Sequence, residues 1–99
     1  MSALHPEDTV CLSTQAVWSD LNGEIAVLHL SAGVYFGIEG AGCEIWKFLQ
    51  EPHTVRQIID HLLASYEVSE DVCEKLTYSF LEQLAEPGLI LVQTHAGVT

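Results

Sequence analysis

Residues 24–46 read EIAVLHLSAGVYFGIEGAGCEIW, and this stretch decides the fold. Two apolar runs, 24–30 and 34–38, meet at a Ser-Ala-Gly loop, which is the pattern of a β-hairpin. A glycine-rich turn over 39–42 follows, and a helix is expected over 42–49. The stretch therefore predicts a small sheet whose last strand leads directly into a helix. In a simple meander that last strand is a free edge, and a free edge can capture an extended peptide by main-chain pairing.

The strands on either side of this loop can be assigned from their turns. Asn22-Gly23 is a strong hairpin signal, so residues 15–19 are expected to form the preceding strand. A three-residue loop over 31–33 sets the predicted register, with Leu30 opposite Val34, Leu28 opposite Phe36, and Ala26 opposite Ile38. These six side chains are expected on the core face. The outer face is then expected to carry Val27, His29, Tyr35 and Gly37, with Trp18 pairing near Val27.

The rest of the chain has helical periodicity. Thr54 with Gln57 three residues later predicts a capping box, and the helix should continue to about residue 65. Ser69 is expected to cap a third helix that Pro87-Gly88 ends. Residues 10–12 and 89–92 read as short extended pieces. We expect one α+β domain over 1–99, winged helix-turn-helix-like, with a three-stranded antiparallel sheet packed on three helices, a core over about 14–92 and frayed ends.

The third helix has an unusually wide apolar arc. At 100° per residue it covers roughly 180°, whereas a core-facing stripe needs only about 100°. The arc contains Val72, Leu76, Phe80, Cys73, Leu84, Thr77 and Leu81. The excess is either core in a small bundle or one wall of a groove beside the strand over 34–38. Cys73 and Thr77, at the side of the arc, are small enough to leave space for a ligand.

The charge balance excludes several partners. The chain has 3 Lys and Arg against 14 Asp and Glu, a net charge of −11. Nucleic-acid binding needs a basic patch, and an anionic membrane surface repels such a chain. No apolar run approaches about 18 residues, and the N-terminus lacks a signal-peptide pattern, so a cytoplasmic location is expected. A protein partner should be basic or apolar.

Little in the sequence indicates catalysis. The three cysteines have no Cys-x-x-Cys or zinc-site spacing, and the five histidines are scattered, so no metal or cofactor is expected. Cys43 and Cys73 read as small apolar residues on helices. A small thiol enzyme that uses one of them with a histidine is an alternative. We expect that the chain is not an enzyme.

One family has the same arrangement of signals. The run LHLSAGVYFGI over 28–38, followed by a small-residue turn and Ile45-Trp46, resembles the strand signature of the PqqD-like family. The capped Thr54-Val55 helix and the Leu81, Leu84, Gly88, Leu89 ending extend the resemblance over about 16–92. Such proteins are recognition elements for ribosomally made, modified peptides (RiPPs). The short stand-alone form looks most like the leader-binding B proteins of lasso-peptide pathways. The chain lacks the Pro-Glu-Gly stretch typical of the quinone-cofactor pathway, which disfavours that pathway.

The resemblance implies a site and partners. A precursor's leader segment is expected to add as a strand beside 34–38, against the third helix. The implied peptide-binding residues are Val34, Tyr35, Phe36, Gly37, Ile38, Cys73, Leu76, Thr77 and Phe80. The implied partners are the leader peptide, a leader-cleaving cysteine protease and an ATP-dependent cyclase. The alternative function is a winged-helix DNA-binding regulator, which the net charge of −11 disfavours.

Overall fold

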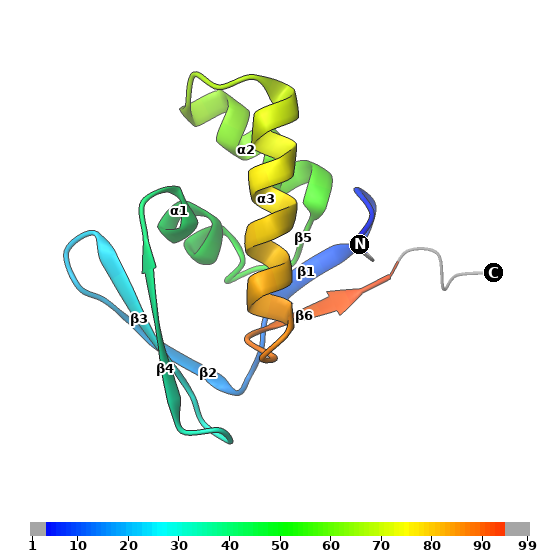
Figure 1. The fold of residues 1–99 in the computed structure, drawn as a ribbon. Coiled ribbons are helices and arrows are strands. Elements are labelled where there is room, and N and C mark those ends of the chain that lie inside the picture. The colour runs from blue at the N-terminus through cyan, green and yellow to red at the C-terminus, as the bar shows by residue number, and fades with distance from the viewer. Residues whose placement is uncertain (1–3, 95–99) are drawn as a thin grey trace.

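Three helices and two three-stranded antiparallel sheets make up the computed structural model, which describes residues 4–94 (Figure 1). In chain order the elements are β1 (Thr9–Leu12), β2 (Ala16–Asp20), β3 (Glu24–His29), β4 (Val34–Glu39), α1 (Ala41–Phe48), β5 (His53–Thr54), α2 (Val55–Ser65), α3 (Glu70–Ala85) and β6 (Ile90–Gln93). The α+β class is as predicted. The predicted frayed ends fall partly on residues 1–3 and 95–99, which lie outside the described residues.

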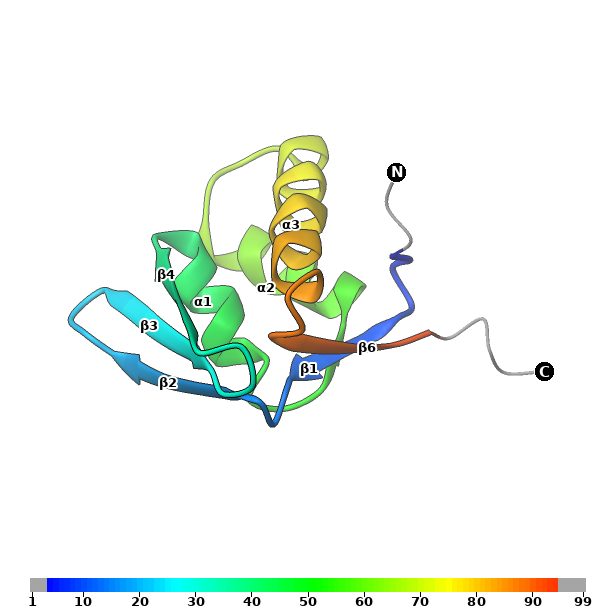
Figure 2. The same ribbon diagram turned by 60° about the horizontal axis from the view of Figure 1, so that its bottom comes forward.

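The two sheets lie together on one side of the helices (Figure 2). One sheet has the order β2-β3-β4, which is the predicted meander. The other has the order β5-β1-β6 and was not predicted as a sheet, although β1 and β6 fall on segments expected to be extended. Val10 of β1 is fully buried, so the folded part extends further toward the N-terminus than the predicted core of about 14–92.

The predicted register of the β3–β4 hairpin is wrong by one residue. His29 pairs with Val34, so the loop has the four residues 30–33, and the Gly33 N–H donates to the His29 carbonyl at 2.8 Å. Val27 therefore lies opposite Phe36, and Ile25 opposite Ile38. Because side chains alternate along a strand, this slip turns every residue of β3 to the other face.

The slip places different residues of β3 in the core. Ile25 and Val27 are 1% and 0% exposed, whereas Leu28 and Ala26 belong to the outer face. Trp18 pairs with Val27 as predicted, but on the core side, where its ring meets Trp46 edge-on with centroids 6.3 Å apart. Phe36 and Ile38 of β4 face the core, as predicted.

The helix starts follow their predicted caps. Thr54 accepts from the Gln57 N–H, and the Gln57 side chain accepts from the Thr54 N–H, which completes the capping box. The Ser69 hydroxyl accepts from the Val72 N–H at 3.3 Å. Between residues 4 and 94 no helix has both the length and the hydropathy required to span a bilayer.

Candidate functional site

The hydrogen-bonding edge of β4 that points away from β3 is open. In its sheet β4 is the last strand, and within residues 4–94 no strand other than β3 pairs with it. In Figure 1 it forms the edge of the sheet nearest α1. An open edge presents a row of main-chain donors and acceptors that another strand can use.

The hydrogen bonds between β2 and β3 show which residues face that edge. The Leu30 N–H donates to the Gln15 carbonyl, and the Leu21 N–H donates to the Glu24 carbonyl. The N–H and C=O of one residue point the same way. The main-chain groups of even-numbered residues of β3 therefore hydrogen-bond to β2, and those of odd-numbered residues hydrogen-bond to β4. With the observed register, the residues of β4 that point their main-chain groups to the open edge are Tyr35, Gly37 and Glu39.

The side chains of β4 divide between two faces. Phe36 is half-buried and Ile38 is 4% exposed, because both face the helices. Tyr35 is 72% exposed on the outer face. A strand added beside β4 would likewise have alternate side chains toward the helices and toward solvent.

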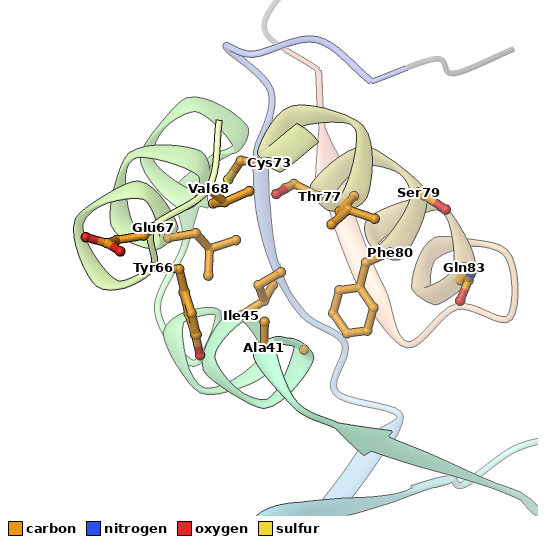
Figure 3. A pocket seen from close by; sticks show the side chains of 13 residues that line it. Ala41, Ile45, Tyr66, Glu67, Val68, Cys73, Thr77, Ser79, Phe80 and Gln83 are labelled. Carbon is orange, nitrogen blue, oxygen red and sulfur yellow. The ribbon is translucent and has the colours of Figure 1, made fainter. Parts of the chain in front are cut away.

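A cavity of about 540 Å³ lies between α1, α3 and the α2–α3 loop (Figure 3). Its walls are mainly apolar, and the main apolar side chains are Ile45, Leu62, Val68, Cys73, Leu76 and Phe80. Polar groups also line it, from Glu67, Ser79 and Gln83. Such a concave apolar space is suited to a large apolar side chain.

The cavity adjoins the end of β4 through Gly42. A Cβ on Gly42 would lie 2.9 Å from the Phe80 ring and 3.0 Å from Cγ2 of Ile38. Phe80 is a wall of the cavity and Ile38 belongs to β4, so the two features meet at the start of α1. The cavity therefore lies next to the C-terminal end of β4.

The structure brings four of the predicted site residues together around this cavity, namely Cys73, Leu76, Thr77 and Phe80. None of the five predicted residues of β4 lines the cavity, and of these Ile38 lies next to it through Gly42. Sequence reasoning missed the contributions of α1 and the α2–α3 loop, including Gly42 and Val68. Gly42, the last residue of the predicted 39–42 turn, was a usable signal, whereas no pattern marked Val68.

The wide apolar arc of α3 is divided between core and surface. Leu81 is 0% exposed and belongs to the core, whereas Leu76 is 63% exposed. Cys73 and Thr77 line the cavity, although their own side chains are only 3% and 1% exposed. The Thr77 hydroxyl is buried without a hydrogen-bond partner.

The charges near the open edge are negative. Glu24 and Glu39 lie opposite one another at the end of the β3–β4 ladder, and the Glu39 carboxylate raises the pKa of Glu24. Lys47 is bonded to Asp20 at 2.6 Å, and Arg56 contacts Glu70 at 3.3 Å. With two of the three cations already paired, the described surface has no basic patch for nucleic acid, which removes the support for a DNA-binding regulator.

The Cys43 thiol is not activated. The Cys43 thiol donates to the Ile38 carbonyl at 3.3 Å, and burial raises its pKa, so it stays protonated near neutral pH. Cys73 is buried in the wall of the cavity. Among residues 4–94 no three His, Cys, Asp or Glu side chains come close enough to hold a metal ion. The surroundings of Cys43 therefore give no support to it as the nucleophile of a thiol enzyme.

Comparison with known proteins identifies the family. Residues 24–90 match the family model described as Coenzyme PQQ synthesis protein D (PqqD). The chain belongs to the PqqD family. The matched part of this PqqD-family chain runs from β3 to the start of β6, and it includes the open edge and the cavity. No curated protein gives a significant match.

Two solved structures are similar to this PqqD-family chain. "TbiB1 in Complex with the TbiA(beta) Leader Peptide" is 32% identical, with a TM-score of 0.76, over 81% of this chain and 93% of that chain. "Lasso peptide synthetase B1 complexed with the leader peptide" is 20% identical, with a TM-score of 0.73, over 83% and 96%. The second likeness shows the fold alone. The winged-helix label is not confirmed by these comparisons.

Proposed function

We propose that this chain is an adaptor that binds the leader segment of a ribosomally made precursor peptide. The observation that carries the proposal is the open edge of β4 beside an apolar cavity. The comparisons support it, since TbiB1 was solved with a leader peptide and is 32% identical to this chain. We propose that the pathway is a lasso-peptide pathway, the class for which the second solved structure is named.

In this proposal the main chain supplies affinity. The leader pairs with the N–H and C=O groups of Tyr35, Gly37 and Glu39, which gives up to six hydrogen bonds. Each contributes about 0.5–1.5 kcal/mol net, whatever the leader's side chains. Strand addition by itself therefore binds many sequences weakly.

The side chains supply selectivity. Leader residues that point to the helices meet Phe36, and one beyond the end of β4 enters the cavity beside Phe80. Full burial of one such apolar side chain contributes about 1.5–3 kcal/mol. After the ordering cost of the leader, a micromolar Kd, about −8 kcal/mol, is within reach.

The chain itself does no chemistry in this proposal. A leader-cleaving cysteine protease and an ATP-dependent cyclase act on the precursor while this chain holds its leader. The step belongs in the cytoplasm, because ribosomes make the precursor there. Cys43 fits this role, because its half-buried thiol has a pKa that burial raises.

Direct binding tests the proposal. Two fluorescein-labelled peptides serve as probes: the leader of the precursor encoded beside this chain's gene, and the TbiA(beta) leader. Fluorescence anisotropy should give a micromolar or tighter Kd for the first, and mass spectrometry should find that peptide intact after incubation. A scrambled leader is the control. The proposal is wrong if neither leader binds better than the scrambled peptide, or if the isolated chain cleaves or modifies the leader.

A further inference from the structure

Gly37 lies at the centre of the open edge, and its own chain gives no reason for a glycine there. It is not among the glycines with positive φ, so other residues can adopt its backbone conformation. A Cβ at this position would have no heavy atom within 4 Å. Glycine is a poor strand former, and within a strand it often marks the close approach of a ligand or another backbone. The missing side chain therefore indicates a requirement from outside the described chain.

The outer face around Gly37 has a gap with two different walls. Directly across the ladder lies Ala26, which is also small. On one side stands Tyr35, 72% exposed, opposite Leu28, and on the other stands the pair Glu24 and Glu39. The side chains of 35, 37 and 39 share this face because strand side chains alternate. The gap is thus open to solvent and to any strand that is added along β4.

We propose that this gap accepts a large side chain of the leader, an aromatic one, at the position directly opposite Gly37. This inference rests on the proposed function. In this proposal the leader adds antiparallel to β4. Gly37, which points its N–H and C=O to the open edge, then pairs with one leader residue, whose side chain lies on the same outer face. An aromatic ring across from an edge glycine covers the exposed main chain, and here it can also pack against the Tyr35 ring. Gly37 therefore determines which side chain the edge selects.

The gap beside Gly37 selects a different leader side chain from the one that enters the cavity. The leader residues on either side of the aromatic point to the inner face, toward Phe36 and the helices, because the alternation continues into the added strand. The leader is consequently read on both faces. A leader with the right apolar inner residues and a small residue opposite Gly37 should bind more weakly.

The substitution Gly37→Val tests this inference. Its β-branched side chain suits a strand and meets open space, so the variant should fold with an equal or higher melting temperature. It fills the gap, so the Kd for the gene-adjacent leader, measured by fluorescence anisotropy, should rise at least tenfold. Gly37→Ala should give an intermediate loss. Ser19→Val is the matched control: it belongs to the same cross-strand row on β2, two strands from the edge, and should bind within twofold of the original chain.

An alanine scan of the leader identifies the partner residue. One aromatic position should lose at least tenfold in affinity for the original chain and less than threefold for Gly37→Val. If folded Gly37→Val binds within twofold of the original chain, the inference is overturned, and Gly37 only weakens the edge against aggregation. If the scan finds no position with this coupling, it is overturned as well. Failure of the proposed function is distinguishable, because then the original chain itself does not bind the leader.

Discussion

The Phe80 ring lies so close to Gly42 that a Cβ on residue 42 would come within 2.9 Å of it. This contact joins α3 to the first turn of α1. It fixes the position of the ring that separates the cavity from β4. The shape of the proposed site therefore depends on the absence of a side chain at position 42.

Gly42→Ala should weaken leader binding and cost about 1–3 kcal/mol of stability, because the added methyl overpacks the contact with Phe80. Chemical denaturation and anisotropy measure the two effects. Phe80→Leu should recover part of the stability in the double variant, since the shorter side chain leaves room for the methyl. Additive losses would mean that the ring does not press on residue 42.

Tyr35→Pro tests the role of the main chain at the edge. The Tyr35 N–H points away from β3, so proline removes a donor that the sheet does not use. We expect at least a tenfold weaker Kd for the leader and a circular dichroism spectrum that is little changed. Phe36→Pro is the contrast, because it removes a donor that pairs with β3 and should destabilise the fold. An unchanged Kd in folded Tyr35→Pro would move the site away from β4.

Two leucines on α3 should separate the core from the peptide-binding surface. Leu81 is 0% exposed, and Leu81→Ala should cost about 2–5 kcal/mol of stability. Leu76 is 63% exposed, and Leu76→Glu should change stability by only about 0.5 kcal/mol while it weakens leader binding. The binding assay should be repeated at high salt, which removes repulsion from the added charge. Normal binding by Leu76→Glu would exclude this part of α3 from the site.

A substitution of Thr77 cannot test the peptide-binding surface separately from the core, although the sequence favours this residue as a site residue. Its place at the side of the apolar arc and its small size predict space for a ligand beside it. With 1% exposure, Thr77→Glu would bury a carboxylate, and we expect it to unfold the domain.

Local signals explain what could be predicted from the sequence. Thr54 with Gln57, Ser69, and Asn22-Gly23 each satisfy or redirect the main chain within a few residues, so they fix helix starts and a turn without tertiary information. The free edge of β4 follows from the order of the hairpins. Residues 81–89 and 28–46 were also sufficient to predict the family.

The remaining features depend on contacts between distant segments. Whether Leu30 belongs to the strand or to the loop cannot be decided locally, because it is apolar in both cases. The burial of Val27 beside the Trp18–Trp46 pair decides it. The cavity likewise combines α1, the α2–α3 loop and α3, and no short-range pattern marks Val68 as part of it.

The pair Glu24 and Glu39 should make stability depend on pH. The Glu39 carboxylate raises the pKa of Glu24 in the folded state, so folding favours the protonated form. The resulting stability is fully present below the ordinary pKa of 4.5 and is lost as the pH rises through the raised folded pKa. Deprotonation of Glu24 replaces its side-chain hydrogen bond with Glu39 by repulsion between like charges across the strands. Glu39→Gln should therefore have a higher melting temperature than the original chain at pH 7 and low salt, with the difference shrinking below pH 4.5 and in high salt.

Glu67→Gln is the control for net charge, because Glu67 lies away from this pair at the cavity. An equal gain at pH 7 from both substitutions would show that general charge reduction, and not this pair, sets the stability.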